Sequence, residues 1–273
     1  MEEKALTAKK SGFSMLLLCF IVFASGAALF VYAIGHLERG ENALGGFLLV
    51  VAILGYIAGI IALPGFKVLK PQEALVLTLF GHYAGTLREP GFYWVCPFCT
   101  AVNPAAGTKL SQSGDVDGGA HAASQSDGMG KKISLKMMTL NNSRQKINDC
   151  LGNPVEIGIA VIWRVTDTAK AVFNVDNYKE YLSLQCDSAL RNVVRVYPYD
   201  VAPNVDTTGD GVADEGSLRG SSEVVAARIR DEIQKNVAEA GIEVVEARIT
   251  YLAYAPEIAA VMLQRQQASA IID

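Results

Sequence analysis

Two long uncharged stretches dominate the first quarter of the chain. No charged residue occurs in residues 11–35 or in residues 44–66. A helix that crosses a bilayer needs about 20 apolar residues, because each residue adds ~1.5 Å across a hydrocarbon core of ~30 Å. The pattern therefore predicts a transmembrane hairpin with helices over residues 11–35 and 44–66, preceded by an N-terminal segment of residues 1–10.

Each apolar stretch has an alternative interpretation. The first could be a cleaved signal peptide with Lys9 and Lys10 as its basic region, but its apolar run exceeds the roughly 7–15 residues of such peptides. The second could be a buried helix of a soluble protein. Glycines are more frequent in membrane helices and let two helices approach closely. The second stretch contains Gly45, Gly46, Gly55 and Gly59, so we favour the hairpin.

Basic residues flank the predicted hairpin unevenly. Those outside it are Lys4, Lys9, Lys10, Lys67 and Lys70, whereas the connector between the two stretches has Arg39 alone. Lys and Arg favour the cytoplasmic side of a membrane. We therefore expect both ends of the hairpin, and the domain that follows, to be cytoplasmic.

After residue 66 the chain alternates between short strands and amphipathic helices. Every second residue from Val155 to Val165 is a large apolar side chain, and this period of two over residues 155–166 is typical of a strand. Further strands are predicted over residues 74–80, 92–95 and 245–251, and an extended pattern over residues 132–147. Helical spacing predicts helices over residues 178–196, 225–237 and 257–272. Because these elements show no regular βαβ order, we predict an α+β fold.

One segment of the domain has a different composition. Residues 104–130 are rich in Gly, Ser, Ala and Asp and contain almost no large apolar side chain. Such a segment buries too little apolar surface to order itself. We therefore predict a mobile insertion over residues 104–130.

Three stretches of the domain resemble the SPFH or band 7 family of stomatins, prohibitins and flotillins. The first combines VLKPQEALV (residues 68–76) with EPGFYWVCPF (residues 89–98). The second is DCLGNPVEIGIAVIWRVTDTAKAVF (residues 149–173), and the third is AGIEVVEARITYLAYAPEI (residues 240–258). Their order and spacing are similar to those of the family.

The resemblance implies an organisation for the whole chain. It implies an SPFH domain over residues 67–255, made of two small subdomains, and the start of a coiled-coil-type helix over residues 256–273. The insertion is longer than the family pattern. Members of the family form large ring- or cage-like oligomers that organise membrane microdomains and can regulate membrane proteases. We accordingly expect a non-catalytic, self-associating scaffold in the bilayer of a bacterial inner (plasma) membrane.

Two motifs offer alternative chemistry. Cys96 and Cys99 form a CxxC, which could serve a membrane-anchored dithiol enzyme or supply half of a zinc site. The five cysteines are an odd number in a long chain, so a disulfide framework is not expected. No second CxxC or paired His accompanies Cys96 and Cys99, and we favour a structural role for this turn.

The second motif is acidic. Asp206, Asp210 and Asp214 occupy positions one, five and nine of a calcium-loop pattern. Thr208 stands at position three, and Ser217 stands where a bidentate Glu is required. We favour a solvated acidic loop and keep a calcium-responsive membrane adaptor as the alternative.

Charge excludes one class of partner. The net charge of −4 comes without any basic stripe, so nucleic acid is not expected to bind. The three histidines, His36, His82 and His121, are far apart and belong to no catalytic or metal-binding motif. We predict no cofactor and no catalytic residues.

Overall fold

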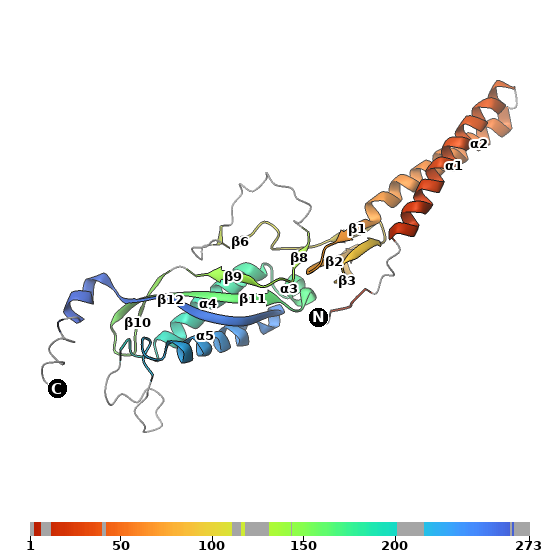
Figure 1. Ribbon diagram of the computed structural model, residues 1–273. Coiled ribbons are helices and arrows are strands. Elements are labelled where there is room, and N and C mark those ends of the chain that lie inside the picture. The colour runs from red at the N-terminus through yellow and green to blue at the C-terminus, as the bar shows by residue number, and fades with distance from the viewer. Residues whose placement is uncertain are drawn as a thin grey trace. The chain divides into compact units, whose positions relative to one another are not determined.

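The computed structural model describes residues 3–6, 12–39, 42–110, 116–117, 131–142, 144–200, 216–262 and 264. Its elements fall into two compact units. The hairpin unit comprises Glu3–Asn103 and Lys131–Ser134, and the helix–sheet unit comprises Pro104–Gly130 and Leu135–Asp273. Figure 1 shows the order of helices and strands along the chain, which confirms the predicted α+β class.

The hairpin unit begins with two long helices. Helix α1 covers Gly12–Glu38 and helix α2 covers Asn42–Ala62. The first helix is thus three residues longer at its end than predicted. The second ends earlier than predicted, and the turn η1 (Leu63–Gly65) follows it. Pro64 lies in that turn, and its ring and missing N–H cannot continue an α-helix.

Two small sheets complete the hairpin unit. In the first, β1 (Phe66–Leu69) pairs antiparallel with β4 (Gly91–Trp94). The second has the order β3-β2-β5, with β8 also paired to β2. Its strands are β2 (Glu73–Leu79), β3 (His82–Leu87), β5 (Cys99–Ala101) and β8 (Ile133–Ser134). Their shared core consists of Leu69, Leu75, Leu77, Leu87, Tyr93 and Val95. The strands predicted over 74–80 and 92–95 are therefore confirmed.

The helix–sheet unit is built on one long antiparallel ribbon. Strand β11 (Pro154–Val165) pairs along its length with β12 (Ile242–Tyr254). Strands β9 (Met138–Asn141) and β10 (Gln145–Asn148) pair with the other edge of β11. The alternating apolar positions of β11 are all buried: Val155, Ile157, Ile159, Val161, Trp163 and Val165. This confirms the period-two strand.

Helices cover that buried face. They are α3 (Thr168–Phe173), α4 (Tyr178–Val194) and α5 (Ser222–Val237), which is followed by the short turn η2 (Ala238–Ala240). Figure 1 shows α4 and α5 lying together along the ribbon. The ring of Tyr178 meets Trp163 edge-on, with centroids 6.3 Å apart. The helices predicted over residues 178–196 and 225–237 are confirmed, and α3 was not predicted.

The last predicted helix lies partly outside the described residues. The chain is helical over residues 256–262 and at residue 264. The amide of Ile258 donates to the carbonyl of Ala255 in its first turn. Pro256 stands at the start, where the fixed φ of proline suits a helix.

The beginning of the predicted insertion is held in place. Ala105 and Thr108 are buried, and the Lys179 Nζ donates to their carbonyl oxygens at 3.2 and 2.7 Å. Asn177 also donates to the Thr108 hydroxyl. Short strands β6 (Lys109–Leu110) and β7 (Val116–Asp117) follow. For residues 104–110, α4 thus supplies polar partners that composition does not reveal. The mobile insertion over residues 104–130 stays a prediction. Residues 111–115 and 118–130, including His121, lie outside the described residues.

A glycine joins the helices to the sheet. The carbonyl of Gly241 accepts hydrogen bonds from the amides of Thr166 and Asp167 and from the Thr166 hydroxyl. Asp167 in turn caps α3, because its carboxylate accepts from the amide of Lys170 at 2.9 Å. Gly241 has a φ of +65°, and a Cβ there would collide with the carbonyl oxygen of Asp167. Only glycine fits both the left-handed backbone and the close approach.

Replacing Gly241 by Ala should strongly destabilise the protein. A side chain at positive φ costs about 1 kcal/mol or more, and the collision with Asp167 adds backbone displacement to that cost. We expect a loss of about 2–4 kcal/mol, measured by thermal or denaturant unfolding of the detergent-solubilised protein.

Gly152→Ala is the matched control. Gly152 has a φ of +81°, but no atom lies within 4 Å of the place that a Cβ would occupy. It should therefore show the conformational cost alone, about 1 kcal/mol. Equal losses in the two variants would refute the role of the close approach at Gly241.

Candidate membrane anchor

Small residues form the contact between α1 and α2. The buried positions of α1 recur every seven residues, and so do those of α2. They are Gly12, Cys19, Gly26 and Ala33 on α1, and Gly45, Ala52 and Gly59 on α2. A seven-residue repeat keeps one seam of each helix facing its partner through a left-handed crossing. We call the contact that Cys19, Gly26 and Ala33 of α1 make with α2, and Gly45, Ala52 and Gly59 of α2 make with α1, the small-residue seam.

Large side chains of one helix fill the space beside glycines of the other. A Cβ at Gly59 would lie 2.8 Å from the ring of Phe23, and one at Gly26 would lie 3.3 Å from Tyr56. The two rings also meet, with centroids 5.8 Å apart. Small residues therefore let the backbones approach closely enough for dispersion contacts, which drive helix association in lipid.

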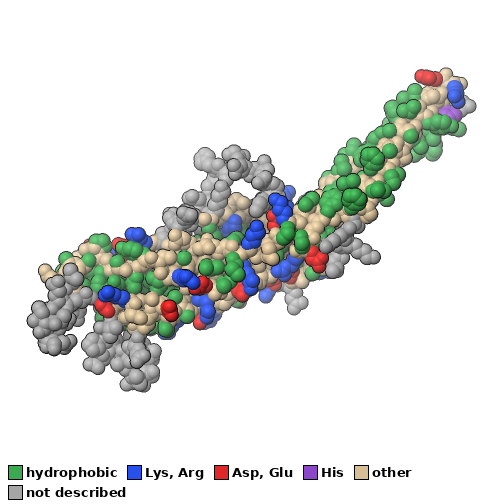
Figure 2. Space-filling view, in the orientation of Figure 1, with side chains coloured by type: hydrophobic (Ala, Val, Ile, Leu, Met, Phe, Trp, Pro, Cys, Tyr) green, Lys and Arg blue, Asp and Glu red, His purple; other side chains and the backbone are tan. Residues whose placement is uncertain are grey.

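The outer surface of the hairpin is apolar. Both helices are long and apolar enough to cross a membrane, and only 11% of each apolar window is buried. Figure 2 shows hydrophobic side chains covering the helix pair. Exposed examples are Phe13, Phe20, Val31, Phe47, Leu54 and Ile60. A helix from a soluble core would bury such residues, so this exposure fits a lipid environment.

The base of the hairpin is bonded to the β1–β4 ribbon. The indole Nε1 of Trp94 donates to the carbonyl of Ala62 at 3.1 Å, and the amide of Val95 donates to the carbonyl of Gly65 at 2.9 Å. A Cβ at Gly65 would lie 2.5 Å from the carbonyl oxygen of Val95. The rings of Phe66 and Phe92 stack beside this joint, with centroids 5.5 Å apart. The first strands of the domain are thus fixed directly to the end of α2.

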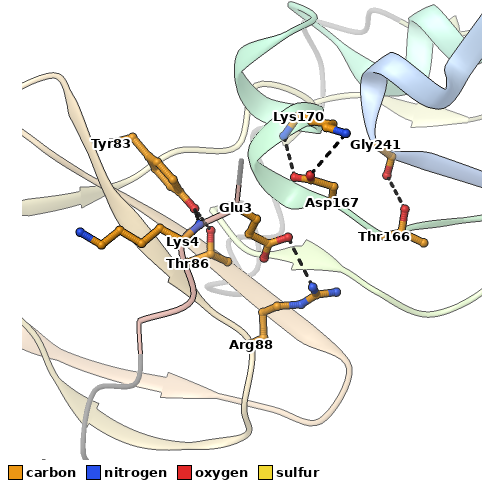
Figure 3. Close-up of polar contacts among 9 residues, drawn as sticks. All are labelled: Glu3, Lys4, Tyr83, Thr86, Arg88, Thr166, Asp167, Lys170 and Gly241. Carbon is orange, nitrogen blue, oxygen red and sulfur yellow. Dashed lines mark hydrogen bonds and ion pairs between the residues drawn. The ribbon is translucent and has the colours of Figure 1, made fainter. Parts of the chain in front are cut away.

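The residues before α1 pair with β3 through an isolated β-bridge between Ala5 and Thr86. Figure 3 shows Glu3 and Lys4 beside Tyr83, Thr86 and Arg88 of the β3 region. The amide of Leu6 donates to the carbonyl of Thr86, and the amide of Thr86 donates to the carbonyl of Lys4, both at 2.9 Å. The pairing is parallel to β3. We call residues 3–6 the N-terminal strand.

Side chains add specificity to this pairing. Leu6 packs against the core of the hairpin unit, where Gly85 leaves room for it. Glu3 forms an ion pair with Arg88 at 3.3 Å. The main-chain amide of Lys4 donates to the Tyr83 hydroxyl at 3.2 Å.

The stabilities of the paired and released strand are close. Ordering the backbone costs about 1–2 kcal/mol per residue, or about 4–8 kcal/mol in all. The two main-chain hydrogen bonds return about 1–3 kcal/mol, and partial burial of Leu6 about 1–2 kcal/mol. The Tyr83 bond and the partly exposed ion pair add about 1–2 kcal/mol. The balance lies within a few kcal/mol of zero.

The pairing also constrains topology. The N-terminal strand precedes α1, whereas β3 follows α2. Their hydrogen bonds require both ends of the hairpin to lie on the same side of a membrane that the helices cross. This agrees with the predicted hairpin. Which side of the membrane the two ends occupy is predicted only by the distribution of Lys and Arg around the hairpin.

A buried carboxylate ties the remaining segment of the hairpin unit to its sheet. Glu73 accepts hydrogen bonds from the Lys132 ammonium at 3.1 Å and from the amide of Lys70 at 3.2 Å. Desolvation acts to raise the pKa of Glu73, but these donors and their charges outweigh it, so its pKa lies below the ordinary value. Asn103 also donates to the carbonyl of Lys132. Residues 131–134 are thereby anchored beside β2.

The CxxC lies in the hairpin unit, in the turn between β4 and β5. The amide of Cys99 donates to the carbonyl of Cys96 in a tight turn that leads into β5. Burial, together with the neighbouring Cys96 thiol, raises the pKa of Cys99. Reactive thiols need a lowered pKa, which a helix N-terminus or adjacent cations supply. The geometry therefore favours a structural turn.

The candidate calcium ligands, Asp206, Asp210 and Asp214, lie outside the described residues. Among the residues that the structure describes, no three His, Cys, Asp or Glu side chains gather where they could hold a metal ion. The ends of this loop are joined nevertheless. The amide of Leu218 donates to the carbonyl of Pro198, and that of Arg219 to the carbonyl of Tyr199.

Comparison with protein families decides the classification. The model of the SPFH domain / Band 7 family matches residues 67–273, about three quarters of the chain. The chain belongs to the SPFH/band 7 family. This family comprises membrane-associated scaffolds and is generally non-catalytic. The match begins at the residue after Phe66, so this SPFH protein carries its two apolar helices just before the family domain. No match was found among curated proteins.

Sequence reasoning found the apolar helices but missed two parts of the anchor. The spacing of seven between small residues is present in the sequence, whereas the prediction of close helix approach rests on the glycines of the second helix alone. The N-terminal strand is too short for any periodic signal. Its only hint is a large apolar residue, Leu6, in a mostly polar segment.

Enlarging a seam glycine should separate the two helices. In Gly59→Leu the new side chain would occupy the space of the Phe23 ring. We expect overpacking to cost about 1–3 kcal/mol. Thermal unfolding in mild detergent, followed by circular dichroism, measures the loss.

Gly55→Leu provides the matched control on the same helix. No atom lies within 4 Å of a Cβ at Gly55, so this variant should unfold near the wild-type temperature. If both variants lost stability equally, the small-residue seam would not be the contact that holds the hairpin together.

Proposed function

We propose that this SPFH protein is a non-catalytic scaffold that assembles into a large ring- or cage-like homo-oligomer and organises a membrane microdomain. One observation carries the proposal: the family domain is bonded directly to the end of an apolar helix hairpin. The bonds from Trp94 to Ala62 and from Val95 to Gly65 leave no free linker between anchor and domain. Each copy is therefore held at the membrane, where copies can meet in two dimensions.

The chemistry of the described residues supports a scaffold over an enzyme. Polar side chains that are buried there serve structural purposes. Asp149, for example, accepts bonds from the amides of Leu151, Asn153 and Tyr199. The raised pKa of Cys99 disfavours a thiolate at that residue. Family membership further suggests membrane proteases or other membrane proteins as partners that the assembly encloses or regulates.

The mass of the extracted particle tests the assembly. We expect mass photometry and negative-stain imaging in mild detergent to show one uniform species of many subunits with a ring-like outline. Diluting the detergent-solubilised protein should leave the particle mass unchanged. In a closed ring every subunit contacts two neighbours, so a subunit can leave only if the ring opens. Monomers or dimers, in detergent and in polymer-extracted membrane discs alike, would overturn the proposal.

We also propose an orientation, with the SPFH domain in the cytoplasm at the bacterial inner membrane. The N-terminal strand pairs with β3, so both ends of the hairpin share one side. Five lysines flank these ends, whereas Arg39 is the single basic residue of the connector. The positive-inside tendency therefore favours a cytoplasmic domain.

Thiol labelling of intact cells tests this orientation. In a variant that keeps Cys96 alone among its cysteines, a membrane-impermeant maleimide should react only after permeabilisation, because the exposed Cys96 lies on the domain side. When Arg39→Cys is the only thiol instead, it should react in intact cells. The reverse pattern would place the domain outside the cytoplasm.

A further inference from the structure

The N-terminal strand covers a sheet edge. β3 is the last strand of its sheet and pairs with β2 on one side only. On the other side it accepts residues 3–6 through the bonds to Thr86. An extended segment that adds to an exposed edge in this way gains affinity from main-chain bonds and specificity from its side chains.

We propose that this edge of β3 is a strand-acceptor site, and that within the assembly it takes the N-terminal strand of a second copy. The inference rests on the oligomeric function proposed above. It specifies how neighbouring copies are joined: each copy donates residues 3–6 to one neighbour and accepts the same residues from another.

The acceptor selects this segment by three features. Thr86 offers a donor and an acceptor to the backbone, Gly85 leaves a notch for an apolar side chain, and Arg88 provides a cation for a carboxylate. Leu6 and Glu3 are the side chains that meet the last two features. Every copy of the chain carries both the acceptor and the matching strand, so a second copy is the occupant whose chemistry is already known to fit.

The N-terminal strand and the edge of β3 that accepts it lie near the same end of the helix hairpin. Helix α1 begins at Gly12, whose backbone lies against Phe92 of β4. Strand and acceptor therefore stay near the same end of the hairpin in every copy. Residues 7–11 join Leu6 to Gly12, so these two residues can lie at most about 22 Å apart when the chain is fully extended. Exchange is consequently limited to copies in direct contact.

Exchange requires that the strand can leave its own acceptor. The free energy gained by its few hydrogen bonds and by burying Leu6 is close to the entropic cost of ordering its four residues. Pairing within one copy and pairing between copies use the same contacts, so effective concentration decides between them. A donor that passes from each copy to the next makes a head-to-tail contact, which generates a ring when the rotation closes.

Cysteine trapping across two differently tagged copies tests the exchange. The native cysteines are replaced, and Ala5→Cys is placed on one copy and Thr86→Cys on the other. These residues lie opposite each other in the parallel pairing, and adjacent strands about 4.8 Å apart are within disulfide reach. Oxidation in native membranes should yield disulfide-linked dimers that carry both tags. Placing both cysteines on one copy reports that the acceptor remains intact.

Matched variants establish specificity. Val68→Cys, an exposed position on β1 of the same unit, replaces Thr86→Cys to measure random collision and should give little dimer. Adding Leu6→Ser to the donor should reduce the dimer about tenfold, because the apolar plug is lost. Lys4→Ser should leave it unchanged, since Lys4 is exposed and uses only its backbone in the pairing.

The outcomes separate this inference from the proposed function. Mixed-tag dimers that need Leu6 support strand exchange. Disulfides found only within the doubly substituted copy, in particles that are nevertheless large, overturn the exchange and leave the scaffold standing. Absence of mixed dimers in particles that are monomeric overturns both.

Discussion

The hydrogen bond between the amide of Val95 and the carbonyl of Gly65 is the contact on which the arrangement of the hairpin unit depends. It joins the end of the membrane hairpin to the first antiparallel ribbon of the SPFH domain. Because Gly65 has no side chain, the two backbones meet at a distance that any Cβ would prevent. The Trp94 indole closes the same joint from the other side by bonding to Ala62. The position of β1 relative to α2 follows from this pair of bonds.

The remaining contacts of the unit build on that joint. The β1–β4 ribbon contributes Leu69 and Tyr93 to the core that β2 and β3 share. With β3 fixed there, its outer edge lies where the residues before α1 can reach it. The N-terminal strand then places a second connection across the base of the hairpin. Hydrogen bonds thus join the ends of the hairpin to the domain at two places. At Gly65 the end of α2 bonds to Val95, and at Thr86 the residues before α1 bond to β3.

Periodicity predicted the parts of this fold that repeat. The alternation over residues 155–166 identified β11, and the stripe that contains Ile229 and Ile233 identified α5. Both features arise because one face of each element is buried over many residues. Contacts made by single residues left no such pattern. The hydrogen bonds of Lys179 to residues 105 and 108 and the pairing of the N-terminal strand with β3 depend on partners distant in sequence. Composition predicts a mobile segment from residue 104, and it does not reveal the bonds from α4 to the beginning of that segment.

The small-residue seam and the pairing of the N-terminal strand differ in how easily each contact can be broken. The small-residue seam is steric: Phe23 and Tyr56 occupy space that only glycine leaves, so the hairpin has one close-packed arrangement. The N-terminal strand is instead held by a few main-chain bonds and one apolar side chain, whose sum nearly equals the entropy of ordering it. A rigid anchor fixes where each copy stands in the bilayer. In the proposed assembly, this strand pairs with its own acceptor or with that of a neighbouring copy without disturbing the anchor, because Gly12 and the joint at Gly65 keep their contacts when it leaves. In that proposed assembly, the same chain therefore combines a fixed position in the bilayer with a sheet edge that can exchange its strand.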